Sequence, residues 1–200
     1  MRSLTIRKIL GLVILCTACP VYAQNSAPAA HNENWDFSVW VAAETGEELT
    51  NSFSESQIWS AGIFAGRMLT GERLQSWRRG RLEYAADFMP VFETYGNQRV
   101  HGYGFEPVIF RWNSALHAAR ISPYIELAGG GVSTNANLPP GNTSSFNFTA
   151  KGGGGVYLRT RPRQSFDVGF HWSHISNANL GIDNFEFNGV QLSLAYHWFK

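Results

Sequence analysis

Polar side chains near the end of the chain include the types needed for nucleophilic catalysis by a serine. The stretch 171–180 reads HWSHISNANL, and Asp183, Asn184, Glu186 and Asn188 follow it. A serine hydroxyl becomes a nucleophile when a neighbouring base accepts its proton, and a histidine base needs an acceptor on its second ring nitrogen. The cluster thus contains a nucleophile, a base and several acceptors.

Side-chain alternation along a strand decides which members of this cluster can meet. Residues of equal parity share a face, so His174 and Ser176 lie side by side on the apolar face of their predicted strand. The same rule places Asn184, Glu186 and Asn188 on the apolar face of the next strand. Because antiparallel strands joined by a short loop are neighbours, Glu186 or Asn188 could orient the imidazole, and the two residues rank equally.

Two further features of the cluster bear on its chemistry. An oxyanion would be stabilised by the Asn184 side chain or by backbone N–H groups around Asn179. His171 and Ser173 repeat the spacing of the candidate pair with the opposite parity, so we expect them to point inward as packing groups. The non-catalytic alternative is that the outward His and Ser are interfacial residues that meet lipid headgroups.

No other catalytic or cofactor signature stands out. The sequence contains no H-E-x-x-H motif, no G-x-S-x-G elbow and no nucleotide-binding glycine pattern. The glycine runs 129–131 and 152–155 lie within predicted strands, where small residues relieve crowding in a bent sheet. Cys16 and Cys19 both lie in the N-terminal segment, which leaves the mature chain without a Cys nucleophile, disulfide or Cys metal site. No cofactor is implied.

From residue 35 onward the chain repeats segments of alternating apolar and polar residues, each followed by a Gly, Asn, Ser or Pro cluster. Eight strands are predicted, at 35–44, 57–70, 80–93, 101–113, 120–133, 145–159, 164–177 and 185–199. Alternation is clearest in the third segment, where one face carries Leu82, Tyr84, Ala86, Phe88, Pro90 and Phe92 and the other carries Glu83, Ala85 and Asp87.

Strands of this length with one apolar face and aromatic residues near their ends are typical of a transmembrane barrel. We therefore predict an all-β fold, an eight-stranded antiparallel transmembrane β-barrel of the outer membrane. Paired charges are expected to fill its lumen, namely Glu83, Asp87, Glu106 and Glu126 with Arg111 and Arg120. The alternative is a soluble β-sandwich or lipocalin-like barrel with its apolar faces turned inward.

The N-terminus has the pattern of a secretory signal peptide. Basic residues precede a short apolar run, and Val21-Tyr22-Ala23 resembles a cleavage site. We expect a signal peptide at 1–23, a flexible segment at 24–34 and the barrel at 35–200. An uncleaved anchor and a lipoprotein attached through Cys19 are the alternatives. Removal of 1–23 changes the formal net charge from +1 to −2, and nothing in it suggests a nucleic-acid partner.

The run His174-Ile175-Ser176-Asn177-Ala178, with Asn184 and an apolar last strand, resembles the H-x-S-N-A signature of the PagL-type lipid A 3-O-deacylases, a family also called acyloxyacyl hydrolases. Weaker likenesses cover most of the mature chain, at Pro107, Arg111, 123–127, Asn147 and Phe148. The resemblance implies an eight-stranded outer-membrane barrel that hydrolyses the ester-linked acyl chain at the 3-position of lipid A, with a Ser-His-Glu triad on its lipid-facing surface.

Carried onto this sequence, the resemblance makes Ser176 the nucleophile and His174 the base. Asn184 matches the family asparagine that assists the oxyanion. One departure concerns the third member of the triad. The family glutamate falls at Asn188, which can accept a hydrogen bond but carries no charge, and Glu186 lies two residues earlier on the same face.

The sequence thus favours a calcium-independent serine esterase in the outer membrane, with substrate acyl chains lying along Phe170, Trp172 and nearby aromatic side chains. The expected partners are lipid A or lipopolysaccharide as substrate and the surrounding outer-membrane lipid. Nucleic acid is not expected, and association into a homodimer is left open. The alternatives are a non-enzymatic small barrel with a structural, adhesion or limited transport role, and a soluble secreted lipid-binding barrel.

Overall fold

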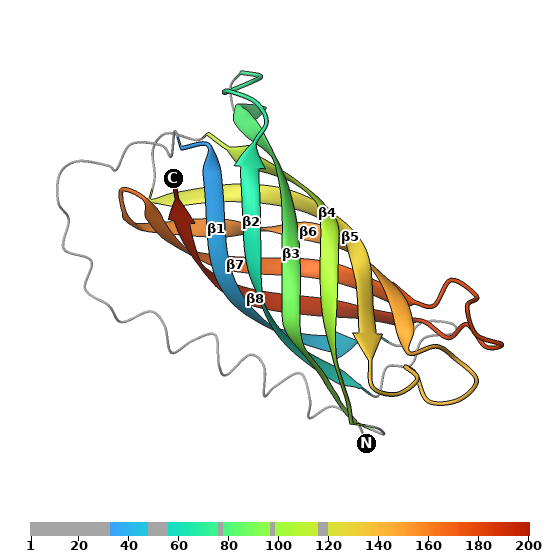
Figure 1. Cartoon of the computed structure of the whole chain (residues 1–200). Coiled ribbons are helices and arrows are strands. Elements are labelled where there is room, and N and C mark those ends of the chain that lie inside the picture. Colours follow the sequence, from blue (N-terminus) through green and yellow to red (C-terminus); the bar gives the residue numbers. More distant parts are fainter. Residues whose placement is uncertain (1–32, 48–55, 76–77, 97–98, 116–119) are drawn as a thin grey trace.

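The eight strands of the chain close into one antiparallel barrel (Figure 1). The computed structural model describes residues 33–47, 56–75, 78–96, 99–115 and 120–200. The strands are β1 Trp35–Gly46, β2 Gln57–Met68, β3 Gly80–Tyr95, β4 Val100–Ser114, β5 Ile121–Thr134, β6 Phe146–Arg161, β7 Gln164–Ser176 and β8 Phe187–Phe199. Each strand pairs with its neighbours in sequence, and β1 closes the barrel against β8 from Asp36↔Phe199 to Gly46↔Gly189.

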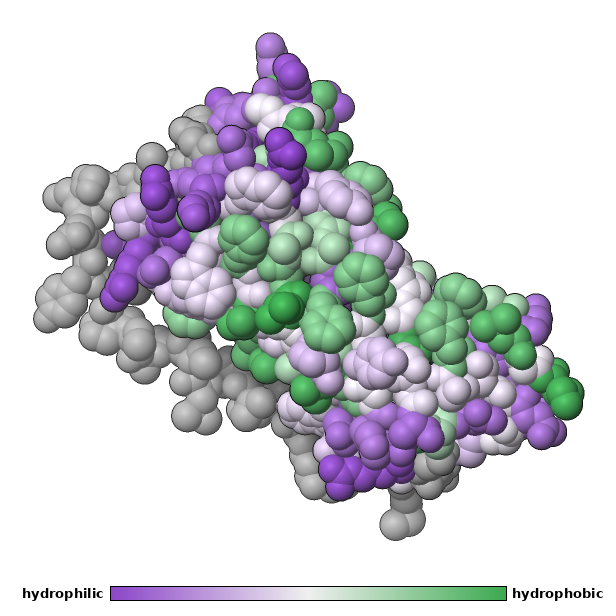
Figure 2. All heavy atoms as spheres, viewed as in Figure 1, coloured by the Kyte–Doolittle hydropathy of each residue, from purple (hydrophilic) through white to green (hydrophobic). Residues whose placement is uncertain are grey.

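Alternation along the strands separates an apolar exterior from a polar lumen. In β1, for example, Phe37 and Val39 are exposed, whereas Asp36 and Ser38 are buried. The space-filling view shows apolar and aromatic side chains around the middle of the barrel, with hydrophilic residues towards both ends (Figure 2). A closed sheet with such a belt satisfies its backbone hydrogen bonds internally, as a bilayer requires.

Charged side chains fill the lumen, and Arg111 is at their centre. Its guanidinium lies 2.5 Å from Glu126 and 3.8 Å from Asp36. It also sits over the rings of Phe64 and Tyr124, at 4.5 and 4.4 Å from their centroids. Glu106 pairs with Lys151 at 2.8 Å, whereas no ion pair joins Glu83 or Asp87 to a cation among the described residues. The lumen is therefore packed with side chains rather than an open pore, and only some of the predicted charge pairs form.

The structure confirms the predicted fold, and each strand begins and ends within two residues of its predicted limits. Two expectations about single side chains were wrong. Phe92 is 3% exposed and packs inside with Met89, because the register of β3 against β4 shifts between Met89 and Phe92. Pro90, which has no N–H for the ladder, lies in this bulge. Arg120 is exposed at the start of β5 instead of lying in the lumen.

The glycine runs lie in β5 and β6, as predicted. A Cβ atom at Gly153 would approach the Phe170 carbonyl oxygen to 2.2 Å, and one at Gly130 would approach that of Phe105 to 2.2 Å. The glycines therefore allow strands to come close where any side chain would collide with backbone.

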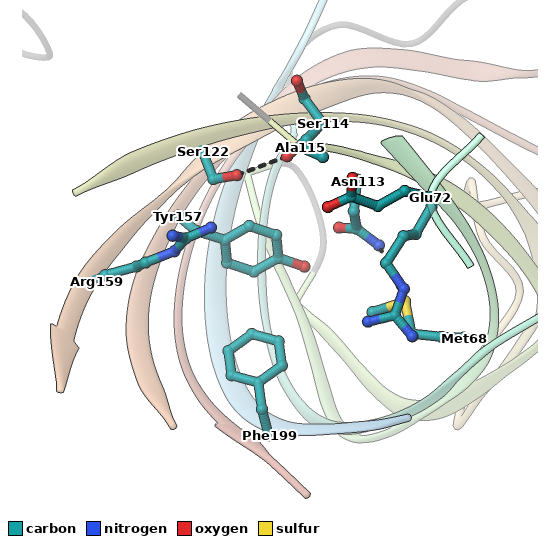
Figure 3. A pocket seen from close by; sticks show the side chains of 10 residues that line it. Met68, Glu72, Asn113, Ser114, Ala115, Ser122, Tyr157, Arg159 and Phe199 are labelled. Carbon is teal, nitrogen blue, oxygen red and sulfur yellow. Dashed lines mark hydrogen bonds between the residues drawn. The ribbon is translucent and has the colours of Figure 1, made fainter. Parts of the chain in front are cut away.

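The two ends of the barrel differ in what they carry. The end at which β1 begins and β8 ends has the connections 69–79, 115–120 and 162–163, whereas the opposite end has 47–56, 96–99, 135–145 and 177–186. At the end where β1 begins, a cavity of about 40 Å³ lies among Met68, Glu72, Tyr157, Arg159 and Phe199 (Figure 3). Because Ser176 ends β7 at the opposite end, this cavity is separate from the candidate catalytic cluster.

The predicted signal peptide, residues 1–23, lies outside the described residues, and so does most of the predicted flexible segment 24–34. Within the part of the chain that is described, no helix has the length and apolar character needed to cross a bilayer.

Candidate active site

Strand pairing brings the predicted site residues of β7 and β8 together. His174 and Asn188 are direct partners in the antiparallel register of these strands, so their side chains leave the sheet on one face as close neighbours. Ser176 is the last residue of β7 and lies opposite Phe148 of β6. Glu186 immediately precedes β8.

Hydrogen bonds link four of these side chains in a row. The Oγ atom of Ser176 is 3.0 Å from Nε2 of His174, and Nδ1 of His174 is 2.8 Å from Oδ1 of Asn188. The Nδ2 group of Asn188 in turn donates to Oε2 of Glu186 at 3.5 Å. Asn188 therefore contacts the imidazole directly, and Glu186 contacts Asn188.

The row of hydrogen bonds is compatible with the tautomer of His174 that nucleophilic catalysis needs. If the Ser176 hydroxyl donates to Nε2, that nitrogen is the basic one and Nδ1 carries the ring proton. The ring proton then donates to the Asn188 carbonyl oxygen. This is the arrangement in which a histidine can remove the serine proton.

The site lies on the exterior of the barrel. Trp172, two residues before His174, is 47% exposed, and its ring stacks on the imidazole with centroids 6.0 Å apart. His174 and Ser176 are half-buried, and Asn188 is buried. The hydrogen bonds thus run from a partly exposed hydroxyl to a buried amide.

The inward pair of β7 has the contrasting environment that its parity predicts. His171 is 4% exposed and lies 3.4 Å from Glu126 in the lumen. Ser173 is 3% exposed and donates a hydrogen bond to Glu44. These two residues belong to the interior network and do not face the lipid side.

The loop after Ser176 is organised by Asn177, whose importance the sequence reasoning missed. Its side chain is fully buried, donates to the Asp183 carbonyl at 2.8 Å and accepts from the Asn179 N–H at 2.9 Å. Ala178 and Asn179 both have positive φ angles, 50° and 64°, a backbone conformation that costs free energy for residues other than glycine. The N–H of Asn179 is thus engaged within the loop.

A second loop braces the first. The Asp183 N–H donates to the Asn142 carbonyl at 3.0 Å, and a Cβ at Gly181 would come within 2.8 Å of Thr143. Sequence alone gave no sign of this contact, because it joins loops that are distant in the chain. Asn184 is half-buried in the same loop, and its Oδ1 atom is buried with no hydrogen-bond partner among the described residues.

Within the described ranges, no group of three or more His, Cys, Asp or Glu side chains is arranged to hold a metal ion. The row of hydrogen bonds that starts at Ser176 offers a hydroxyl, an imidazole, an amide and a carboxylate. Such a set can carry out nucleophilic acyl transfer with proton transfer by the histidine.

The family model described as "Lipid A 3-O-deacylase (PagL)" matches residues 55–197, which include every residue of this site. The chain belongs to the PagL family. Solved structures agree with this PagL assignment at the level of the fold. The structure titled "Crystal structure of the outer membrane enzyme PagL" superposes with a TM-score of 0.54 at 22% identity, covering 80% of this chain and 97% of that one.

Neisserial surface protein A (NspA) is also similar to this PagL-family chain. It has a TM-score of 0.58 at 14% identity and covers 83% of this chain and 97% of its own. At these identities both likenesses concern the barrel and not the chemistry. No curated protein sequence matches the chain significantly.

Proposed function

We propose that this PagL-family chain is an outer-membrane serine esterase that removes the ester-linked acyl chain at the 3-position of lipid A. The observation that carries the proposal is the hydrogen-bond row Ser176–His174–Asn188 on the apolar exterior of a closed barrel. Polar side chains are costly on a lipid-facing surface. An aligned hydroxyl and imidazole there suit a substrate that stays in the membrane.

The reaction proceeds in two halves. Ser176 Oγ attacks the ester carbonyl carbon while His174 Nε2 accepts the hydroxyl proton, which gives a tetrahedral oxyanion. Collapse breaks the bond to the sugar oxygen, which takes the proton from His174 and leaves as the free 3-hydroxyl. Water then gives a proton to His174 and attacks the acyl-serine ester. The fatty acid is released and the proton returns to Ser176.

Asn188 has the role that a carboxylate has in most triads. Its oxygen accepts from Nδ1 and holds the ring in place, but it brings no charge to stabilise the imidazolium. The proposed side-chain donor to the oxyanion is Asn184. The Asn179 N–H would have to exchange its bond to Asn177 for the oxyanion.

The exterior beside the site suits an acyl chain. On β6, Ala150 and Gly152 lie opposite His174 and Trp172, so the residues of the adjacent strand next to the catalytic pair are small. Outer-membrane barrels have short periplasmic turns and longer extracellular loops. Three of the four connections at the site-bearing end have ten or eleven residues, against one of three at the other end. By that rule the site-bearing end faces outward, at the level of the leaflet that contains lipid A, and residues 1–23 would be the signal peptide that exports the chain.

The test is mass spectrometry of lipid A from cells that express the protein or its variants. Wild type is expected to remove the mass of the 3-linked acyl chain, and Ser176→Ala and His174→Ala are expected to leave lipid A intact. Ser173→Ala is the matched control, because this serine has the same spacing from a histidine but lies in the lumen. It should retain deacylation in proportion to the folded barrel recovered in the outer-membrane fraction.

Unchanged lipid A in cells that contain folded wild-type barrel would contradict the proposal and favour a non-enzymatic role. Deacylation that persists in Ser176→Ala would contradict the assigned nucleophile.

A further inference from the structure

We propose that Glu186 is a positioning residue that acts through Asn188, by locking the asparagine amide in the one orientation that keeps His174 Nε2 basic. This inference rests on the proposed esterase function. It assigns to Glu186 a role that requires no contact with the imidazole, the serine or the substrate.

The argument begins with the ambiguity of an amide. An asparagine can present either its oxygen or its NH2 group to a neighbour after a 180° rotation about the last side-chain bond. If Asn188 presented NH2 to His174, Nδ1 would have to be the acceptor and the ring proton would sit on Nε2. The imidazole could then no longer accept the proton of Ser176, as in triads whose tautomer is wrong.

A neutral asparagine cannot make this choice by itself, because both orientations give one hydrogen bond to an imidazole. Glu186 breaks the symmetry. Its Oε2 atom lies 3.5 Å from Nδ2 of Asn188, and an ionised carboxylate only accepts hydrogen bonds. The rotated amide would place the Asn188 oxygen against the carboxylate oxygen and lose this bond, so the carboxylate disfavours the inactive tautomer.

The surroundings leave the amide few other ways to move. Asn188 is 5% exposed, and its backbone carbonyl accepts a hydrogen bond from the Glu47 N–H at 2.7 Å. The backbone of residue 188 is therefore held on two sides, by this bond and by the ladder to β7. Within this fixed backbone, the bond to Glu186 bears on the orientation of the Asn188 amide.

The row also places a negative charge near the imidazolium without direct contact. The charge on Glu186 is separated from Nδ1 by the Asn188 side chain, whereas the carboxylate of an ordinary triad contacts Nδ1 directly. It can thus support the cation that forms when His174 takes the serine proton, though less strongly than a contacting carboxylate.

The test is a double-mutant cycle on purified, refolded protein, with a lipid ester as substrate. Glu186→Ala is expected to lower kcat about 10- to 100-fold with little change in KM. This loss is smaller than the roughly 100- to 10,000-fold that general acid–base catalysis supplies, because Glu186 acts on the histidine only through Asn188. Asn188→Asp places a carboxylate directly on Nδ1, which has no tautomer ambiguity. In that background Glu186→Ala is expected to leave kcat unchanged or raise it, because it removes a like charge. Glu93→Ala, another carboxylate near the same end of the barrel, is the control and should have wild-type kcat.

A second readout does not depend on turnover. Nitrogen-15 spectra of the histidine rings in micelles report the tautomer, and His174→Gln identifies the resonance. In Glu186→Ala, the nitrogen-15 chemical shifts of the two ring nitrogens of His174 are expected to move towards each other, because the ring would then be a mixture of the two tautomers.

Each outcome decides. Wild-type kcat and an unchanged His174 spectrum in Glu186→Ala would overturn the positioning role. An equal loss of kcat in both backgrounds would overturn it as well, since it would indicate a merely structural effect. If wild type and Ser176→Ala are equally inactive on the ester, the proposed function fails, and the nitrogen-15 spectra still test the orientation of Asn188.

Discussion

Replacement of Arg111 by Met tests whether paired charges stabilise the interior of the barrel. Arg111 is 5% exposed and contacts Glu126 at 2.5 Å through Nη2, and Tyr157 at 2.5 Å through Nη1. Methionine fills much of the same space but leaves the Glu126 carboxylate without its main partner. Removing one member of a buried pair costs about 3–5 kcal/mol, which corresponds to roughly a 150- to 5,000-fold change in the folding equilibrium.

The assay is urea unfolding of protein refolded into lipid vesicles, followed by tryptophan fluorescence. Arg163→Met is the matched control, because Arg163 pairs with Glu33 at 3.1 Å but its side chain is 71% exposed. An exposed pair contributes at most about 1 kcal/mol. Adding Glu126→Leu to Arg111→Met should recover most of the loss, because it removes the unpaired charge. Equal stabilities of the two arginine variants would refute the reasoning.

Two other predictions concern the site. Gly152→Leu places a bulky side chain on the exterior beside Trp172, where Leu127 lies 3.2 Å from the Cβ position. It should lower kcat/KM about tenfold for a long-chain ester and leave a short soluble ester unaffected. Equal effects on both esters would contradict an acyl chain lying there. Asn177→Ala removes two hydrogen bonds of a buried side chain, at a local cost of about 1–3 kcal/mol. It should speed amide hydrogen exchange in residues 178–183 and lower kcat, and unchanged exchange would argue against its role in the loop. Asn34→Ala is the control, because Asn34 is exposed at the other end of the barrel.

Most of the fold could be predicted because each side chain in the wall of a barrel faces either the lumen or the exterior, and these two directions alternate along a strand. A period of two in β7 and β8 was enough to place His174 and Asn188 on the exterior, and the register then made them direct partners. The two-sided rule failed at Phe92. There one extra residue in a bulge reversed the parity, and only Pro90 in the sequence hinted at it.

The finer arrangement of the site could not be predicted, since it depends on contacts between loops and on hydrogen-bond direction. The sequence ranked Glu186 and Asn188 equally, because both have the right parity. The structure separates them by one hydrogen bond, since Asn188 contacts the imidazole and Glu186 contacts Asn188. The buried role of Asn177 and the brace from residues 135–145 depend on how two distant loops pack, which period-two reasoning does not address.

The central claim is that the hydroxyl of Ser176, on the lipid-facing exterior, is an activated nucleophile. Its most direct test is to treat the folded protein in micelles with a long-chain alkyl fluorophosphonate and to locate the modified residue by peptide mass spectrometry. The account predicts a single adduct on Ser176 that is lost in His174→Ala. An adduct on a lumen serine such as Ser173, or equal labelling of Ser176 with and without the histidine, would contradict it.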